Sequence, residues 1–306
     1  MAHIMSSCFQ YREHVSCADR LFPCGKAPKY WSINWSAAIV HLVNAVAMLL
    51  LWNGSENRDS VYRLTETYAP WVPPVNGTCA PGGIRISEDW CLERRTVPTA
   101  ELSLWWLIIG FHGLSFVFQT LAMGECRALG KQKYTVEVEE QGTNTLRMLE
   151  YSVSATLMQL AIALLLGVWQ RLVIIGIAFL TAATMLMGLV AEQSRLADLR
   201  TAWVAHVTGW FTMGGVWLIL GRQLEFTLVK SPNGPPAFVY AIIVVIALLY
   251  SVFGFIQTYQ LCKTNKGDAR ALNETVEVAY CINSLVSKTF LGWMIFSNAL
   301  VGVARS

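Results

Sequence analysis

Lys288 is the residue whose type and position in this chain most clearly predict chemistry. It lies near the middle of the last long apolar stretch, Val276 to Val301. At about 1.5 Å per residue it is about 18 Å from either end of that stretch, too far for its side chain to reach water easily. An ammonium at the centre of a membrane costs at least about 2.5 to 3.5 kcal/mol, so it needs a partner or a change in its chemistry. Lys288 is therefore a functional-site hypothesis.

Glu150 is the clearest partner for this lysine. It lies near the start of the third apolar stretch, in the segment Arg147-Met-Leu-Glu150-Tyr151, whereas the other acids lie in loops or at helix ends. A purely structural ion pair is one interpretation, but desolvation offsets much of the attraction in such a pair. A desolvated lysine can instead be a nucleophilic amine that condenses with an aldehyde. If the aldehyde is a conjugated polyene, Glu150 would be the counter-ion of the protonated imine.

Seven apolar stretches are long enough to cross a membrane and must position these two groups. The chain has 306 residues, 54% hydrophobic and 14% charged, which is typical of a polytopic membrane protein. Helices are predicted because the stretches are continuously apolar and backbone groups must be paired within lipid. The fold class is all-α, with an N-terminal tail, residues 1–34, before a seven-helix domain, residues 35–303. The predicted spans are 35–52, 101–123, 148–169, 172–191, 202–220, 237–260 and 276–301.

The distribution of Lys and Arg predicts the orientation in the membrane. The N-terminal tail and the loops after spans two, four and six carry thirteen of these residues, and the other side carries nine, five of them in one long loop. The positive-inside rule therefore places the N-terminus in the cytoplasm and the C-terminus outside. The net charge of +3 is small and is spread over the loops, which gives no support to nucleic acid as a partner.

The longest loop, residues 53–100, is extracellular in this orientation. It contains Cys79 and Cys91, which can form a disulfide in an oxidising compartment. It also contains two acceptor sequences for N-glycosylation, at Asn53 and Asn76. Such triplets also occur by chance, so their use stays open. The other six cysteines are predicted to be reduced thiols, and no Cys/His spacing resembles a metal site.

A polyene bound to Lys288 needs an elongated aromatic slot. The spans around the lysine offer eight aromatic side chains, and we expect about half of them to line a pocket, because aromatics on membrane helices also serve packing and interface anchoring. The candidates are Tyr151, Trp210, Phe211, Trp217, Tyr250, Phe253, Phe255 and Trp293.

Seven spans, a lysine in the last and the Arg147-Met-Leu-Glu150-Tyr151 segment resemble the retinal-binding microbial rhodopsins. Ion-pumping members have an aspartate four residues before the lysine and a further carboxylate later in the third span. This chain has Ser284 at the first position and no acid from Tyr151 to Trp169. With a cytoplasmic N-terminus, a long extracellular first loop and a glutamate counter-ion, it is similar to the heliorhodopsins over nearly all of the chain beyond residue 30.

The resemblance implies a cofactor and roles for individual residues. The cofactor would be all-trans retinal, bound covalently to Lys288 as a Schiff base, with Glu150 as the single counter-ion. Ser284 and Ser115 would belong to the Schiff-base region, and the retinal pocket would include Tyr151, Trp210, Phe253 and Trp293. The polar, proton-accepting cluster would comprise His41, Asn44, Gln119 and, on the cytoplasmic side, Gln260. Gln119 is the closest match, by its spacing from Ser115, to a histidine of the family, and His112 lies one turn earlier.

Three functions are compatible with this chain, none of them enzymatic. The leading one is a light sensor, in which retinal isomerisation and a slow return shift the bundle between two conformations that an unknown cytoplasmic partner reads. A homodimer in the lipid bilayer is implied by the resemblance alone. The rival is light-driven proton or ion transport, by pump or channel. There Glu192 and Glu277 would line a cytoplasmic half-channel, although solvated helix-end positions explain them as well. A retinal-free receptor or scaffold is the third, and it predicts no visible chromophore.

Overall fold

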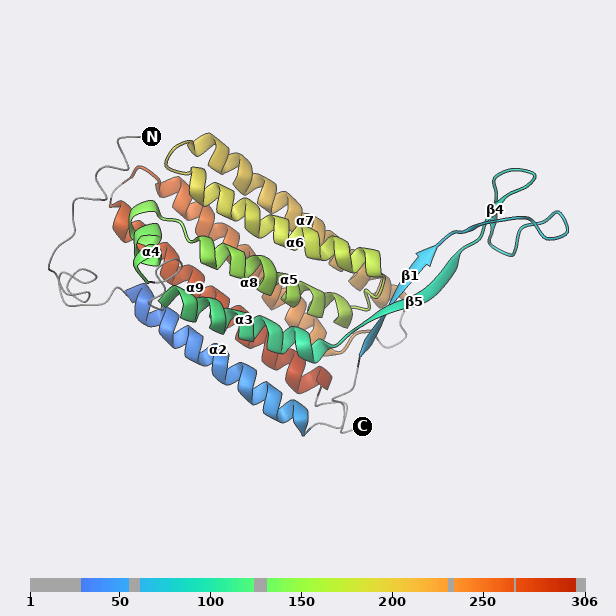
Figure 1. The fold of residues 1–306 in the computed structure, drawn as a ribbon, viewed down its shortest axis with the longest axis horizontal. Helices are drawn as coiled ribbons and strands as arrows, with labels where there is room; N and C mark the ends of the chain where they lie inside the picture. Colours follow the sequence, from blue (N-terminus) through green and yellow to red (C-terminus); the bar gives the residue numbers. More distant parts are fainter. Residues whose placement is uncertain (1–28, 55–60, 124–130, 231–233, 267, 301–306) are drawn as a thin grey trace.

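Seven long helices form the body of the molecule. The computed structural model describes residues 29–54, 61–123, 131–230, 234–266 and 268–300; the rest of the predicted N-terminal tail, residues 1–28, lies outside them. Each of the seven helices is long and apolar enough to cross a membrane, and they lie side by side in one bundle (Figure 1). The prediction of a seven-helix membrane protein is thus confirmed. The helices are α2 (Lys29–Asn53), α3 (Leu104–Met123), α5 (Thr145–Leu165), α6 (Arg171–Ser194), α7 (Leu199–Lys230), α8 (Ala237–Lys263) and α9 (Ala269–Ile295).

Several helices extend further than the predicted spans. The clearest case is α9, which begins at Ala269 rather than at residue 276, because the side chain of Asp268 caps its first turn by accepting from the backbone N–H groups of Arg270 and Ala271. Polar residues continue a helix beyond its apolar part without cost to its backbone pairing, so hydropathy detects only the membrane-embedded portion. The last helix continues as a short π-helix, η2 (Phe296–Leu300).

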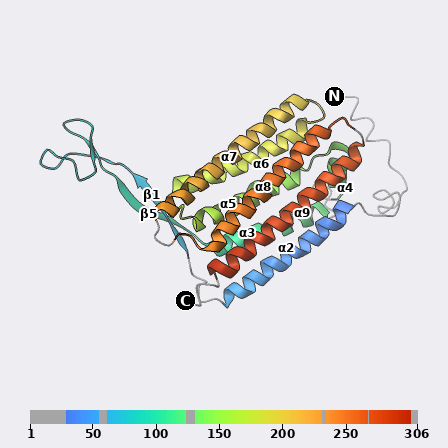
Figure 2. The ribbon, with the colours of Figure 1, turned by 180° about the vertical axis from the view of Figure 1, so that it is seen from behind.

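The two ends of the bundle are covered differently. At one end, the connection between α3 and α5 forms a short helix, α4 (Lys131–Val136), followed by a π-helix, η1 (Glu137–Gln141). We call this the α4 end; α2 and α9 begin there (Figures 1 and 2). From the opposite end, which we call the hairpin end, a β-hairpin projects away from the helices (Figures 1 and 2).

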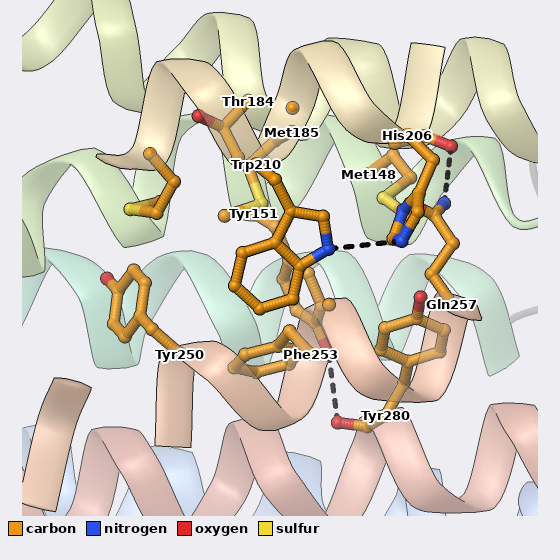
Figure 3. A pocket seen from close by; sticks show the side chains of 14 residues that line it. Met148, Tyr151, Thr184, Met185, His206, Trp210, Tyr250, Phe253, Gln257 and Tyr280 are labelled. Carbon is orange, nitrogen blue, oxygen red and sulfur yellow. Dashed lines mark hydrogen bonds between the residues drawn. The ribbon is translucent and has the colours of Figure 1, made fainter. Parts of the chain in front are cut away.

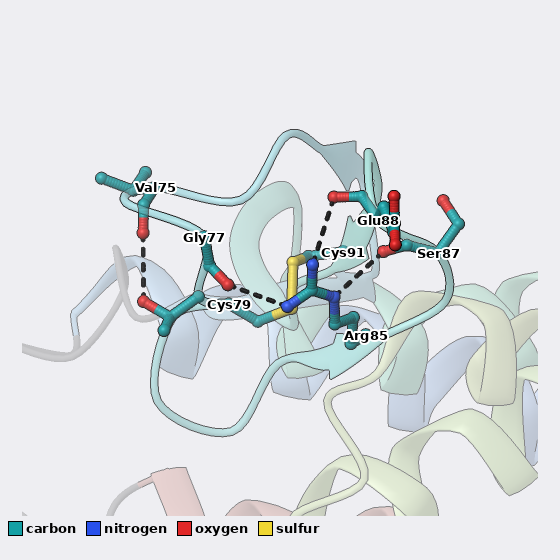
Figure 4. The surroundings of a disulfide bond; sticks show 8 residues. Val75, Gly77, Cys79, Arg85, Ser87, Glu88 and Cys91 are labelled. Atoms are coloured by element: carbon teal, nitrogen blue, oxygen red, sulfur yellow. Dashed lines mark hydrogen bonds between the residues drawn. A yellow bond between two sulfur atoms is a disulfide. The ribbon is translucent and has the colours of Figure 1, made fainter.

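The projecting hairpin is formed by residues that the sequence predicted only as a long loop. Strand β1 (Tyr62–Tyr68) pairs antiparallel with β5 (Arg95–Leu102), and its base is fixed to the bundle by a bond from Thr65 N–H to Trp169 O, 2.8 Å. Its tip is a small sheet in the order β2 (Trp71–Val72), β4 (Cys91–Leu92), β3 (Ile84–Arg85). A disulfide joins Cys79 to Cys91 (Figure 4). The strands of the tip have two residues each, too few for an alternation to be detected, and β5 is exposed along nearly its whole length, so it carries no apolar–polar alternation.

Arg85 and the disulfide together hold the tip of the hairpin. The Arg85 guanidinium donates to the backbone oxygens of Gly77 at 2.8 Å and Ser87 at 3.2 Å (Figure 4). Asn76 lies in an exposed turn beside them, whereas Asn53 is the last residue of α2, and Ser55 of its acceptor sequence lies outside the described residues. Glycosylation stays a prediction at both positions.

The apolar core is concentrated in the hairpin half of the bundle. Fully buried side chains of α3 and α9 meet there, among them Trp105, Phe111, Leu291 and Ile295. Trp105 also packs edge-on against Phe296, with ring centroids 5.3 Å apart. Hydrocarbon and aromatic groups therefore dominate this half, although Gln159 of α5 is also buried in it.

The turn between η1 and α5 depends on a glycine. Gly142 has a φ of +62°, in the left-handed region that L side chains rarely adopt. A Cβ at this position would lie 1.8 Å from a guanidinium nitrogen of Arg195 and 2.3 Å from Asn273 Oδ1. The turn, and with it the start of α5, is thus packed directly against α9 and the residue that follows α6.

We therefore expect Gly142→Ala to destabilise the protein by about 1–3 kcal/mol, through backbone strain and displacement of two buried polar side chains. Thermal unfolding in detergent, followed by circular dichroism, measures this. Gly113→Ala is the matched control, because nothing lies within 4 Å of a Cβ at Gly113. Equal melting temperatures for the two variants would contradict the expectation.

Candidate functional site

The lysine of the last helix contacts a carboxylate and a hydroxyl inside the bundle. Lys288 Nζ on α9 lies 2.5 Å from Glu150 Oε1 on α5 and 2.6 Å from Ser115 Oγ on α3. Ser115 Oγ is also 2.7 Å from Glu150 Oε1, so the hydroxyl accepts from the ammonium and donates to the carboxylate. All three side chains are buried. Three helices therefore converge on one charge pair.

Two further predicted residues lie near the lysine, Tyr151 of the retinal pocket and Ser284 of the Schiff-base region. The ring centroid of Tyr151 lies 5.0 Å from Lys288 Nζ, and the Tyr151 hydroxyl donates to Tyr280 O at 3.2 Å. Ser284 lies one turn before Lys288 and is buried, but its Oγ has no hydrogen-bond partner among the described residues.

An elongated slot runs from the lysine into the bundle. A cavity of about 270 Å³ lies beside Lys288, and a cavity of about 540 Å³ extends from it toward Trp210 and His206 (Figure 3). The two adjoin, since both are lined by Tyr151, Met185, Tyr250 and Phe253. Four of the eight candidate aromatics therefore line the slot, namely Tyr151, Trp210, Tyr250 and Phe253.

The other four aromatics lie elsewhere. Phe211 and Phe255 are 83% and 62% exposed on the outside of the bundle, and Trp217 packs behind Tyr250. Trp293, expected in the retinal pocket, instead donates through Nε1 to Asn44 Oδ1 at 3.1 Å. It follows Lys288 by five residues, so it is rotated from it by about 140° around α9 and faces α2.

A pair of histidines lies on the hairpin side of the lysine. His41 Nδ1 on α2 and His112 Nδ1 on α3 are 2.9 Å apart, and both side chains are fully buried. One Nδ1 therefore carries a hydrogen and the other accepts it, while neither Nε2 has a partner among the described residues. A Cβ at Gly292, one turn beyond Lys288, would lie 2.8 Å from His112 Nε2. The pair is thus close to the lysine.

This pairing corrects the expected composition of the polar cluster. His112, not Gln119, is the α3 residue that contacts His41. Gln119 lies seven residues further along α3, about 10 Å toward the α4 end, where it lines a separate polar cavity. Asn44 lies one turn after His41, as expected, and donates to Thr289 Oγ1 at 3.2 Å.

A second buried charge cluster lies near the α4 end. The Arg147 guanidinium on α5 pairs with Glu192 on α6 and Glu277 on α9, and all three side chains are buried. Glu277 Oε1 also accepts from Tyr134 Oη on α4, 2.7 Å, and from Asn144 Nδ2, 2.8 Å. The interpretation of Glu192 and Glu277 as solvated helix-end groups is wrong, because α4 and η1 cover this end of the bundle.

Tyr134 anchors this cover. Its hydroxyl also accepts from Asn34 Nδ2 at 2.8 Å, which joins α4 to α2. Burial, and then the neighbouring Glu277 carboxylate, raises the pKa of Tyr134 well above its usual value. Tyr134 therefore stays protonated at neutral pH and remains a hydrogen-bond donor to Glu277.

Polar cavities connect the two charge clusters. A cavity of about 350 Å³ is lined by residues of both clusters, Glu150 on one side and Arg147 and Glu277 of the second cluster, and also by Gln119. Glu277 precedes Lys288 by eleven residues, about 16 Å along α9, and the long side chains of Lys288 and Arg147 span most of this distance. Gln260, predicted on the same side, donates to Gly142 O at 2.9 Å beside the Arg147 cluster. A buried polar route thus leads from the lysine to the α4 end.

Comparison with known proteins covers the same part of the chain. A family model described as heliorhodopsin matches residues 30–300. The fold is similar to the crystal structure of the transmembrane domain of Salpingoeca rosetta rhodopsin phosphodiesterase, with a TM-score of 0.59, 99% of this chain and 94% of that chain covered, and 11% sequence identity. At that identity the likeness shows a shared fold alone. No curated protein matches the chain.

The Arg147 cluster leads to a prediction of stability. Arg147→Gln leaves two carboxylates buried without a counter-charge, so we expect it to lower the free energy of unfolding by about 3–5 kcal/mol. Arg222→Gln is the matched control, because Arg222 pairs with Glu225 on the surface of α7, where the side chains are 71% and 57% exposed; we expect a loss of at most about 1 kcal/mol. Thermal unfolding in detergent compares them. Similar losses for both variants would mean that the buried cluster is not a coupled unit.

Proposed function

The chain belongs to the heliorhodopsin family, and we propose that it is a light-sensing membrane protein whose retinal is carried by Lys288. Family membership implies a multi-pass membrane protein that binds retinal through a lysine Schiff base. The observation that carries the proposal is the buried amine of Lys288, which contacts Glu150 and opens onto an elongated aromatic slot.

The residues present fit retinal. Retinal is an elongated apolar aldehyde, and the slot offers an amine at one end and walls of aromatic and methionine side chains along its length, including Tyr151, Met185, Tyr250 and Phe253. When bound, it supplies the absorption of visible light and a change of shape on isomerisation. We propose the all-trans isomer from family membership alone.

The residues around the amine can hold and move a proton. Glu150 balances the positive charge at the Lys288 nitrogen, and Ser115 links the two. Ser284 Oγ, His41 Nε2 and His112 Nε2 are buried without partners among the described residues, so they can form new hydrogen bonds when this pair changes. We propose that a proton leaving the nitrogen is taken up within this group, with Asn44, Gln119 and Gln260 forming the wider polar cluster.

The distribution of buried charge supports sensing. The buried carboxylates of the described residues belong to Glu150, Glu192 and Glu277, from the lysine toward the α4 end. Beyond the lysine, the described residues of the hairpin half include no buried Asp, Glu, Lys or Arg; the buried polar side chains there are uncharged or belong to the histidine pair, among them Gln159. Vectorial ion transport is usually marked by ionisable residues at intervals through both halves of the membrane. The buried carboxylates that a charge change at Lys288 can reach therefore lie toward the α4 end.

The charge distribution of the loops also supports an orientation. With the N-terminus in the cytoplasm, the α4 end faces the cytoplasm and the disulfide-containing hairpin lies outside, where disulfides persist. We propose that the unknown signalling partner binds at the α4 end. A homodimer is proposed from family membership alone.

Light-driven proton transport is the second candidate. It is favoured by one observation, the polar cavity that joins Glu150 to Arg147 and Glu277, which could serve as a half-channel.

The chromophore can be tested by absorption. We expect purified protein to gain a visible band with all-trans retinal and Lys288→Ala to stay colourless. Glu150→Gln should shift the band to longer wavelength, because the carboxylate stabilises the ground state, in which the positive charge is localised near it, more than the delocalised excited state. Glu225→Gln, an exposed carboxylate, is the control and should leave the band unchanged. A band that survives in Lys288→Ala would sink the proposal.

Electrophysiology separates sensing from transport. In voltage-clamped cells we expect no sustained photocurrent at any holding potential, because the described residues of the hairpin half include no buried Asp, Glu, Lys or Arg that could relay an ion. Currents that persist or reverse with voltage, and that vanish in Glu150→Gln, would establish transport instead.

A further inference from the structure

A hydrogen-bonded group at the far end of the slot is not used by the chemistry at Lys288. His206 on α7 is buried, with Nδ1 2.8 Å from Gln257 Oε1 on α8 (Figure 3). Its Nε2 accepts from Trp210 Nε1, one turn later on α7, at 3.1 Å, and lies 2.8 Å from Thr258 Oγ1. All of these except Thr258 line the larger cavity.

The network fixes which nitrogen of His206 carries the hydrogen. Gln257 Nε2 donates to Gly188 O on α6 at 2.8 Å, so Gln257 Oε1 faces His206 as an acceptor. His206 Nδ1 must then be the donor, and Nε2 is left as the acceptor that the Trp210 indole N–H requires. A neutral His206 in this tautomer satisfies the bonds to Gln257 and Trp210, while the Thr258 hydroxyl donates to Gly254 O at 3.0 Å.

The indole of Trp210 packs directly against the backbone of α8 at Gly254, which has no side chain. A Cβ at Gly254 on α8 would lie 2.2 Å from Trp210 Cζ2. On its other side, Trp210 packs against the outward-facing ring of Phe255, with centroids 5.4 Å apart. Trp210 therefore fills the contact between α7 and α8, with the cavity on one side and the outside of the bundle on the other.

We propose that His206 is a positioning residue for retinal, which acts through Trp210. By accepting the indole N–H, it fixes the ring as the far wall of the slot and so determines the space around the end of retinal remote from Lys288. The identity of the ligand, retinal, rests on the proposed light-sensing function, whereas the hydrogen bond between Trp210 and His206 does not depend on it.

The same network determines the chemistry of that wall. The ring nitrogens of His206, the amide of Gln257 and the indole N–H of Trp210 are all engaged with one another or with backbone. The far end of the slot therefore presents ring faces and carbon atoms, which suits a hydrocarbon ring.

The first test uses the protein without retinal. Tryptophan indoles are labelled with ¹⁵N, and the signal that is missing in Trp210→Phe is assigned to Trp210. In His206→Phe we expect this signal to move and its N–H to exchange faster with solvent deuterium, because the acceptor is gone. Thr208→Val is the matched control, since Thr208 is exposed on the same helix and its hydroxyl donates to the backbone oxygen of Val204, one turn earlier in α7. An unmoved Trp210 signal in His206→Phe would overturn the proposal.

The second test uses retinal and a double-mutant cycle. If His206 acts through Trp210, His206→Phe shifts the absorption maximum of the otherwise unchanged protein, and this shift is lost in the Trp210→Phe background. The same shift in both backgrounds would overturn the proposal. If His206→Phe does not fold, Gln257→Leu replaces it, because it removes the acceptor that fixes the tautomer of His206 and should move the same Trp210 signal; an unmoved signal would again overturn the proposal.

The two proposals fail in different ways. A protein that stays colourless with retinal sinks the light-sensing function, whereas the spectrum of the retinal-free protein decides the role of His206 by itself.

Discussion

The need to balance cations deep in an apolar bundle organises this structure. Lys288 and Arg147 are both buried, and each is paired with carboxylates from other helices. Removing one partner of a buried pair costs several kcal/mol, because the remaining charge has no solvent. α5 supplies Arg147 to one cluster and, three residues later, Glu150 to the other. The rotation of α5 about its axis and its depth in the bundle must therefore suit both clusters at once. The Asn144 cap and the turn at Gly142 fix the start of α5 in that position.

This sharing gives the molecule a physical connection between its centre and its α4 end. Along α9, the residues Glu277, Cys281, Ser284 and Lys288 follow one another at helical spacing on one face. A change in the pair of Lys288 and Glu150 can reach the Arg147 cluster through α5 and through this face. From there Glu277 leads to Tyr134 of α4, the element that covers that end. In the hairpin half, the described residues include no buried Asp, Glu, Lys or Arg that could continue this connection.

The sequence was sufficient for the parts that depend on single, unusual residues. Lys288 and Glu150 could be paired because each was the one clear charge of its sign inside a span, and the spans followed from hydropathy. The cluster of Arg147, Glu192 and Glu277 could not be predicted, because their burial depends on α4 and η1 folding over them. His112 was passed over because spacing from Ser115 does not show which face of α3 meets α2. Trp293 was placed in the slot although its five-residue offset from Lys288 already turns it away.

The two ends of the slot differ in how completely their polar groups are bonded, and this difference bears on where motion begins. At the far end, His206, Gln257 and Trp210 satisfy one another, so any displacement there breaks bonds without offering new ones. Around Lys288, Ser284 Oγ, Ser154 Oγ and the Nε2 atoms of His41 and His112 have no partner among the described residues. These atoms can take part in further hydrogen bonds. We infer that the fixed wall and these available groups would direct a change in the shape of bound retinal toward Lys288 and Glu150 rather than outward between α7 and α8.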